Sequence, residues 1–314
     1  MEPPQPVVSV IIVSDYAGGG PSSVEDFRHS LAALAAQDFD ELTEFVLSEW
    51  EGYRDRIPET EFRRILPSLR FAYSDAQSAL DLKNEGVRAA RALLVAILDA
   101  DCDAAQGWLR SAVETLRAHP EIAAVSGRNL SPGRTRLARI MALAGRSVGD
   151  EGSAGPTRHV ALNNIAFHRS VLLEHPFSSI AGPTGFAFYS QKLLRAGLRL
   201  WFDPLMEVVH DDWHLAAVRD VRRQMGRSLI LSRMLDPHHE YGWLVRLRYA
   251  SIPIFVFGKT ALTAKRIVAR RTTQGVHWYE VPAAIAVGFV NHVLEVPGMI
   301  LAFRGRQVRT TTFR

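Results

Sequence analysis

The chain has 314 residues, of which 47% are hydrophobic and 22% are charged, so a disordered chain is excluded and a sizeable core can form. A single cysteine, Cys102, excludes an intramolecular disulfide framework and fits a reducing compartment. Residues 1–4 do not begin a basic segment followed by an apolar one, and we therefore expect no secretory signal.

The formal net charge of +4 is unevenly distributed along the chain. Residues 236–314 contain eleven Lys or Arg and four Asp or Glu, a net charge of +7, whereas the remainder carries 26 basic and 29 acidic side chains. A weakly acidic body with a basic C-terminal segment favours an anionic surface as partner of that segment. We therefore divide the chain into residues 1–235 and a basic, apolar, helical segment at 236–314.

Strand and helix patterns alternate through the first part of the chain. Apolar, β-branched or alternating stretches predict strands at residues 7–13, 44–48, 69–73, 95–98, 122–127, 160–168, 198–202 and 208–210. Apolar residues at helical spacing predict helices at residues 22–37, 82–94, 108–118, 187–196 and 215–235. This alternation predicts an α/β fold with a doubly wound, mixed and mainly parallel sheet flanked by helices.

The sequence VAILDAD at residues 95–101 is the most informative stretch. Its apolar run is typical of a buried parallel strand, and Asp99 and Asp101 follow the carboxyl end, where open α/β sheets bind ligands. Carboxylates two residues apart on an extended segment share one face and can converge on a hard cation such as Mg²⁺ or Mn²⁺. A solvated acidic turn that includes Asp103 is the alternative, and this stretch alone leaves both interpretations open.

The C-terminal segment contains an apolar run at residues 281–303 with one formal charge, Glu295. Its length permits a transmembrane helix, but an acid is costly in the hydrocarbon. We therefore expect amphipathic helices that lie in the membrane interface, with Trp278 and Tyr279 at headgroup depth and nearby Arg residues facing anionic lipid. A buried helical hairpin packed on the sheet is the alternative.

Four pieces of sequence then follow one another in a recognisable order. They are VSVII at residues 8–12; KNEG at 83–86 leading to DAD at 99–101 and GWL at 107–109; NNIAFHR at 163–169; and LRAGLR at 194–199 followed by FDP at 202–204 and VVH at 208–210. Through these pieces the chain resembles the inverting, family 2 type of nucleotide-sugar glycosyltransferase with the GT-A fold. The resemblance covers residues 7–225 and rests on the order and spacing of the pieces together.

The resemblance implies metal-dependent, inverting transfer of a sugar from a UDP- or dTDP-sugar to a saccharide or lipid-linked acceptor, in cell-surface polysaccharide or glycolipid synthesis. Asp99 and Asp101 match the DxD motif, which handles the donor ribose and the divalent ion on the diphosphate. Asp101 is the expected direct ligand of Mn²⁺ or Mg²⁺. His210 matches the histidine that completes many of these metal sites, and a neutral imidazole can join two oxygen donors on Mn²⁺.

Further residues are assigned to the nucleotide. Ser14 and Asp15 directly follow the first strand. Asn84 and Gly86 are expected to let the start of a helix approach the nucleotide. Glu49 stands where the family has paired aspartates that hold the base, and its carboxylate can accept a hydrogen bond from a uracil or thymine imide.

The catalytic base departs from the family pattern. The family has Glu-Asp at the start of the helix that ends in Arg-Ala-Gly, whereas here Gly185 and Phe186 hold that place. Neither residue accepts a proton, although an inverting transfer needs a base near the acceptor hydroxyl. Asp211 and Asp212 are the nearest candidates, and Asp212 would equally suit an N-cap of the following helix. The alternative function is a non-catalytic nucleotide-sugar-binding or scaffolding subunit.

For localisation we expect a cytoplasmic protein with peripheral or interfacial association with the inner face of the plasma membrane. Nucleic acid is not expected as a partner, because long apolar stretches interrupt the basic segment, whereas surfaces that track phosphates are polar. The sequence contains no P-loop, no G-x-S-x-G elbow and no paired-cysteine zinc motif.

Overall fold

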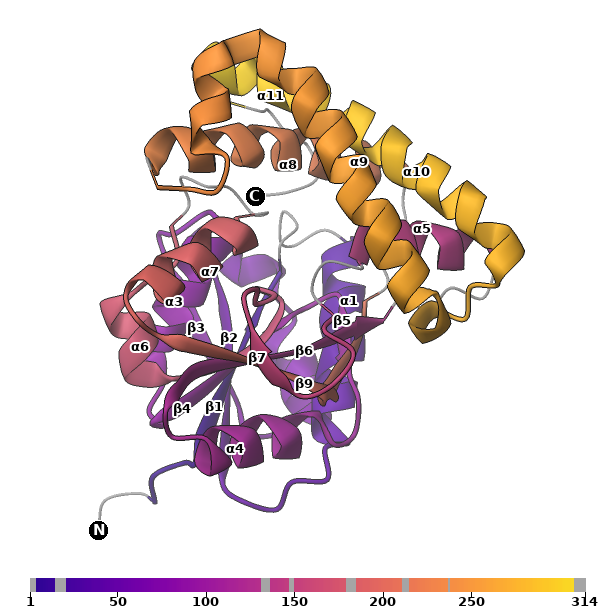
Figure 1. Ribbon diagram of the computed structural model, residues 1–314. Coiled ribbons are helices and arrows are strands. Elements are labelled where there is room, and N and C mark those ends of the chain that lie inside the picture. The colour runs from indigo at the N-terminus through magenta and orange to yellow at the C-terminus, as the bar shows by residue number, and fades with distance from the viewer. Residues whose placement is uncertain are drawn as a thin grey trace.

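One β-sheet and the helices packed on it form the body of the protein, and the C-terminal helices form a group at one end of this body (Figure 1). The structure is a computed structural model, and it describes residues 4–14, 21–130, 136–146, 150–178, 185–210, 215–236 and 238–307. The strands are β1 (Val8–Val13), β2 (Thr43–Trp50), β3 (Leu69–Ser74), β4 (Leu94–Asp99), β5 (Cys102–Ala104), β6 (Ile122–Leu130), β7 (Gly155–Thr157), β8 (Asn164–His168) and β9 (Arg199–His210).

These strands form one mixed sheet in the order β3-β2-β1-β4-β8-β6-β9-β5, and β7 pairs with β9. Strands β3, β2, β1 and β4 are parallel, as are β6 and β9. Strand β8 runs antiparallel to both β4 and β6 and so joins the two parallel parts. The predicted α/β class with a mixed sheet flanked by helices is confirmed.

Helices cover both faces of the sheet. Those of the body are α1 (Pro21–Ala35), α2 (Glu59–Ile65), α3 (Ala79–Ala89), α4 (Trp108–Ala118), α5 (Arg136–Arg146), α6 (Arg169–Glu174) and α7 (Phe186–Arg195), with the 3-10 helix η1 (Glu51–Arg56). Because side chains alternate along β1, Val10 joins a core with α1 and α4, whereas Ile11 joins a second core with α3 and α7. The sheet is therefore buried on both faces.

The C-terminal helices are α8 (Leu215–Leu235), α9 (Ser251–Arg270), α10 (Val281–Leu294) and α11 (Val296–Phe303), with the 3-10 helices η3 (Gly242–Ala250), η4 (Arg271–Gln274) and η5 (Trp278–Glu280). Helix α8 packs on α11, and α10 packs on α9 and on α5 of the body. Two glycines allow α8 and α11 to meet closely. A Cβ added to Gly226 would lie 1.9 Å from the carbonyl oxygen of Glu295, and a Cβ added to Gly298 would lie 1.8 Å from the carbonyl oxygen of Arg223. The division of the chain at residue 235 stays a prediction.

Several predicted elements have different bounds in the structure; the strand predicted at 160–168, for example, is β8, and two further differences have a local explanation. The helix predicted at 82–94 is α3, which begins earlier because the Ser78 hydroxyl accepts a hydrogen bond from Asp81 N at 3.2 Å and caps the helix. The strand predicted to stop at Pro204 continues as β9 to His210. The pairing of β6 with β9 shifts register after Gly127, so that Pro204, which has no N–H, lies in a bulge.

The apolar C-terminal stretch packs against other helices rather than on the sheet. Trp278–Phe303 is long and apolar enough to cross a membrane by length and composition, and 39% of its apolar window is buried inside the protein. Glu295, between α10 and α11, is fully buried and forms an ion pair with Lys259 of α9. Membrane association therefore stays a prediction.

Candidate metal and nucleotide site

The carboxyl ends of β1, β2 and β4 bring several of the predicted site residues to one edge of the sheet. Ser14 follows β1, Glu49 lies near the end of β2, and Asp99 ends β4 opposite Val13. All three side chains are buried. Parallel strands end at the same edge, and this edge is where open α/β sheets bind ligands.

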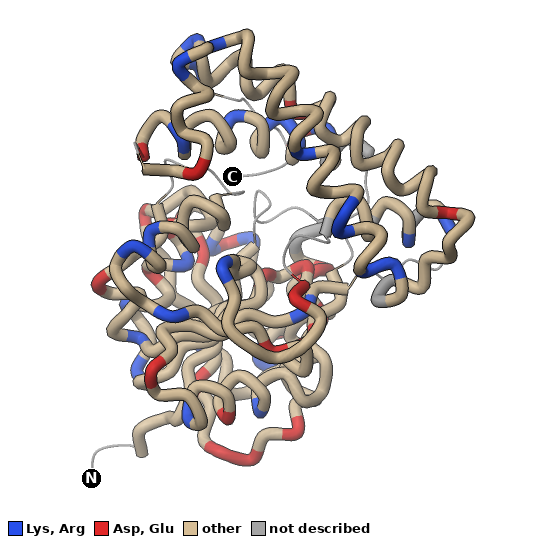
Figure 2. The backbone as a smooth tube through the Cα atoms, viewed as in Figure 1, with Lys and Arg blue, Asp and Glu red and all other residues tan. Residues whose placement is uncertain are grey.

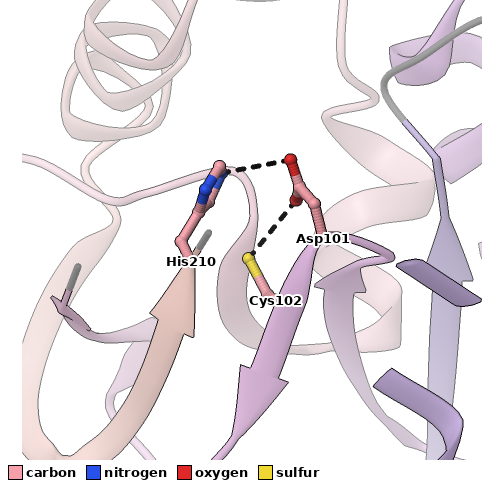
Figure 3. A group of neighbouring side chains, drawn as sticks. All are labelled: Asp101, Cys102 and His210. Carbon is pink, nitrogen blue, oxygen red and sulfur yellow. Dashed lines mark hydrogen bonds and ion pairs between the residues drawn. The ribbon is translucent and has the colours of Figure 1, made fainter. Parts of the chain in front are cut away.

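Asp101, Cys102 and His210 form a cluster beside this edge (Figure 3). The chain turns after Asp99 and enters the short strand β5, whose Cys102 lies opposite His210 at the end of β9. His210 Nε2 lies 3.4 Å from Asp101 Oδ2, and Cys102 Sγ lies 3.6 Å from Asp101 Oδ1. One potential ligand atom of each residue lies within 4.8 Å of the other two. Two predicted metal ligands from distant parts of the sequence are thus neighbours.

The donor atoms of Asp101 and His210 fit a Mn²⁺ ion. Carboxylate oxygen and imidazole nitrogen both suit this ion, whereas the Cys102 thiol suits softer metals. Their side chains keep 5% and 14% exposure, so each can be reached from solvent. Ions that bind substrate phosphates commonly have one or two protein ligands and take the rest from phosphate and water. We therefore assign Cys102 to the wall of the site.

Asp99 lies outside this cluster because its carboxylate has another partner. Lys83 Nζ of α3 lies 2.6 Å from Asp99 Oδ1, and both side chains are at most 3% exposed. The turn after Asp99 also removes the extended geometry that would have placed the two carboxylates on one face. The cluster of possible metal ligands does not include Asp99, and its predicted roles toward the metal and toward the nucleotide both stay predictions. Lys83 was not singled out from the sequence.

Asn84 and Gly86 lie inside α3 rather than at its start, and their predicted approach to the nucleotide stays a prediction. The Asn84 side chain donates to the carbonyl of Phe177 and accepts from its N–H, each at 3.0 Å. A Cβ added at Gly86 would lie 2.3 Å from Ile11 Cγ2, so this glycine lets α3 pack on β1. Glu49 accepts a hydrogen bond from Trp50 N at 2.6 Å, and its role toward a base stays a prediction.

Asp26 of α1 is a further carboxylate of the site. Helix α1 packs against β5, which places Asp26 within electrostatic range of Asp101, Asp103 and His210. Burial and the negative charge of Asp101 raise the pKa of the Asp26 carboxyl to about 6. In the sequence, Asp26 stands near the start of a helix, and only its packing against β5 connects it to the site.

Three predicted residues lie outside the described part of the chain, namely Asp15, Asp211 and Asp212. Their assignments to the nucleotide and to catalysis stay predictions. Gly185 and Phe186 are described, and they begin α7, where the family carries its Glu-Asp pair. No residue between 175 and 202 is Asp or Glu, so α7 supplies no carboxylate base.

Comparison with solved structures identifies the fold as GT-A-like. The mannosyltransferase PcManGT from Pyrobaculum calidifontis, solved in complex with GDP-Man and Mn²⁺, matches with a TM-score of 0.59 and 16% identity over 97% of this chain and 89% of that one. A mycobacterial protein matches with a TM-score of 0.49 and 16% identity over 73% of this chain and 74% of its own. No family model and no curated protein matches the sequence.

Proposed function

We propose that this protein is a metal-dependent glycosyltransferase that takes a sugar from a nucleotide-sugar donor. The observation that carries this proposal is the pair formed by Asp101 and His210, side by side at the carboxyl edge of a GT-A-like sheet. The similar archaeal mannosyltransferase was solved with GDP-Man and Mn²⁺, which supports a nucleotide-sugar donor and this metal. The donors we propose to test are therefore GDP-sugars as well as the UDP- and dTDP-sugars expected from the sequence.

Within this proposal, Asp101 and His210 would hold the metal ion that binds the donor diphosphate. The bound ion would offset negative charge on the leaving diphosphate. The buried pair of Lys83 and Asp99 keeps the end of β4 fixed beside the site, because separating two buried opposite charges is costly. Asp26 adds a second negative charge within electrostatic range of Asp101, so the metal-free site attracts a cation.

Titration of the protein with Mn²⁺ and a panel of nucleoside diphosphates tests this assignment. We expect binding of one nucleotide that requires Mn²⁺ and falls at least about tenfold in Asp101→Asn and in His210→Ala. Asp38→Asn, which removes an exposed carboxylate that pairs with Arg110 and is not part of the Asp101–His210 cluster, is the matched control and should bind normally. Nucleotide binding that does not change with Mn²⁺ or with Asp101→Asn would refute the metal site.

The absence of a carboxylate in α7 favours a second candidate, a nucleotide-sugar-binding subunit that does not catalyse transfer. Sugar release from each donor, measured with and without acceptors, separates the two functions. Turnover lost in Asp101→Asn supports the transferase, whereas tight nucleotide binding without any turnover supports the binding subunit. The predicted bases, Asp211 and Asp212, are tested in the same assay by replacement with Asn.

We further propose that the C-terminal helices lie on an anionic membrane surface, which would place the enzyme on the cytoplasmic face beside a lipid-linked acceptor. Lys and Arg recur along these helices (Figure 2). Large apolar side chains are exposed there, including Trp243 at 61%, Phe257 at 65% and Trp278 at 60%. Exposed aromatic residues mixed with cations are typical of interfacial helices.

Flotation with lipid vesicles tests this surface. We expect the protein to float with vesicles that contain phosphatidylglycerol and to bind much less to pure phosphatidylcholine, with binding that weakens as salt rises. Phe257→Ser combined with Trp278→Ser should reduce flotation, whereas Leu42→Ser, at an exposed position of the body, should not. Equal flotation of all variants would contradict this surface.

A further inference from the structure

A basic cavity lies where the body meets the C-terminal helices. Its volume is about 260 Å³, and it is lined by residues from α5, the start of α7, α8, α9 and the end of α10. Gly185 and Phe186, which stand at the expected place of the catalytic base, form part of its wall. The cavity is smaller than the roughly 300–1,000 Å³ of sites that hold whole drug-sized ligands, so it suits a small group.

Four Lys or Arg side chains line this cavity, against one carboxylate. The cations are Arg222 and Arg233 of α8 and Lys259 and Arg266 of α9, and the carboxylate is Glu295. Glu295 already has close partners, because Lys259 forms an ion pair with it and His292 Nδ1 lies 3.3 Å from its Oε1. The cavity therefore keeps a strong excess of positive charge.

Two of these cations, Arg233 and Arg266, have acidic residues only at longer range, namely Glu240 and Glu151. Neither Arg233 nor Arg266 forms an ion pair with any residue that the structure describes. Arg233 Nε and His239 Nε2 are buried and form no hydrogen bond with the described residues. Burial lowers the pKa of Arg233 to about 10 and also lowers the pKa of Arg266. Arg233 Nη1 donates to the Leu229 carbonyl at 2.9 Å, so the unsatisfied groups are its Nε and His239 Nε2. Buried polar groups without a partner are costly, and an anion bound in the cavity would compensate the Arg233 Nε donor and the excess of positive charge.

Two of the helices that line the cavity also carry exposed apolar side chains. Leu262 lines the cavity and is 53% exposed, and on the same helix α9 the exposed Phe257 packs against Phe289 of α10, with ring centroids 6.0 Å apart. A ligand with an anionic head and an apolar chain would match both features. The positive cavity would hold the head, and the exposed apolar side chains of α9 and α10 would contact the chain.

We propose that this cavity binds the phosphate group of a lipid-phosphate acceptor, and that this phosphate attacks the donor sugar without a general base. The proposal rests on the transferase function proposed above. One phosphate oxygen forms a bond to the anomeric carbon, while the bond from that carbon to the nucleoside diphosphate breaks and its electron pair leaves with the diphosphate. A phosphate monoester has a second pKa of about 6 and is largely ionised at pH 7, so no proton has to be removed. This accounts for Gly185 and Phe186 in place of a carboxylate pair.

Binding of three probes to the full-length protein tests the cavity. We expect farnesyl phosphate to bind at least about tenfold more tightly than farnesol, which lacks the phosphate, and than inorganic phosphate, which lacks the chain. Arg233→Gln and Arg266→Gln should each weaken farnesyl phosphate binding about tenfold. Arg88→Gln, at an exposed position of α3, should leave binding unchanged.

Leu262 provides a test that does not depend on a buried residue. Because this side chain is 53% exposed, Leu262→Glu and Leu262→Gln should both fold. The Glu variant places a negative charge at the cavity and should weaken farnesyl phosphate binding several-fold more than the neutral Gln variant does. Equal effects of the two variants, or equal affinity for farnesol and farnesyl phosphate, would overturn the phosphate site. Equal affinity for inorganic phosphate would overturn the acceptor with an apolar chain.

The transfer step is tested with the donor that the nucleotide panel identifies. Sugar transfer to farnesyl phosphate should rise with pH through about 6, as the acceptor ionises, and should be lost in Arg233→Gln with little change in Mn²⁺-dependent nucleotide binding. Transfer to hydroxyl acceptors alone would overturn the inference and leave the transferase standing. Absence of turnover with every acceptor, together with phosphate binding that Arg233→Gln weakens, would refute the transferase and leave the phosphate site standing.

Discussion

Replacing Glu295 by Gln should destabilise the C-terminal helices. The Glu295 side chain has no exposure, and it contacts Lys259 of α9, Arg222 of α8 at 3.7 Å and His292 of α10 at 3.3 Å. It therefore joins three helices through one carboxylate. Gln keeps the volume but removes the charge, which leaves buried cations without their partner.

The cost follows from the burial of these groups. Removing one partner of a buried ion pair typically costs about 3–5 kcal/mol, and we expect the lower end here because Lys259 keeps 28% exposure. With roughly 2–4 °C per kcal/mol for a chain of this size class, the Tm should fall by roughly 6–12 °C. Thermal unfolding followed by far-UV circular dichroism measures this change.

The pH dependence provides a second measurement. Burial raises the pKa of the Glu295 carboxyl, but the charges of Lys259 and His292 outweigh burial and hold the pKa below its ordinary value of 4.5. A carboxyl with a lowered pKa contributes stability above its unfolded pKa and loses it as the pH falls. The difference in Tm between wild type and Glu295→Gln should therefore be full near neutral pH and shrink as the pH falls below 4.5.

Two further variants complete the experiment. Glu174→Gln, at a side chain that is 77% exposed, should leave the Tm nearly unchanged. The double variant Glu295→Leu with Lys259→Met should be more stable than either single variant, because it removes both charges together. A Tm of Glu295→Gln within about 2 °C of wild type at neutral pH would refute the assignment of this carboxylate as the link between the helices.

Three other substitutions test the body of the protein, and a fourth, in α9, serves as a control. The Asp26 carboxyl has a raised pKa of about 6, so its environment costs stability that builds up as the pH rises from 3.8 to about 6. The metal-free Asp26→Asn variant should therefore gain about 1 kcal/mol, allowing for solvent screening, at pH 8 and little at pH 4. An equal gain at both pH values would contradict this. Gly86→Ala should lower the free energy of unfolding by about 1–3 kcal/mol through overpacking against β1. Gly258→Ala, in a helix with open space at the Cβ, should raise it by up to about 1 kcal/mol. Chemical denaturation measures both, and a Gly86→Ala variant as stable as wild type would contradict the close packing. Lys83→Met should lower the free energy of unfolding by about 3–5 kcal/mol in the same assay, because it leaves Asp99 buried without its cation. A loss below about 1 kcal/mol would show that Lys83 and Asp99 do not form this ion pair in solution.

The local sequence pattern was sufficient to predict the regular helices and strands of the body. The apolar run before Asp99 and the helical spacing of residues 108–118 are strong periodic signals, and both elements occur where they were predicted. Signals at element ends were weaker. Pro204 is a strand breaker when only near neighbours are considered, yet β9 continues past it because the partner strand β6 tolerates a bulge there.

The candidate site likewise combines features that the local sequence determines with features that only the tertiary structure determines. The sequence alone determined that Asp99 and Asp101 follow a buried strand and that a histidine ends a later one, because apolar runs and their boundaries are local properties of the chain. Only the tertiary structure decided which of these groups meet. The turn after Asp99, the pairing of β5 with β9 and the reach of Lys83 from α3 separate the two carboxylates and bring His210 to Asp101. The basic cavity is likewise a tertiary property, since its charges come from α8 and α9 and its wall from α7, and no single stretch of sequence contains all three.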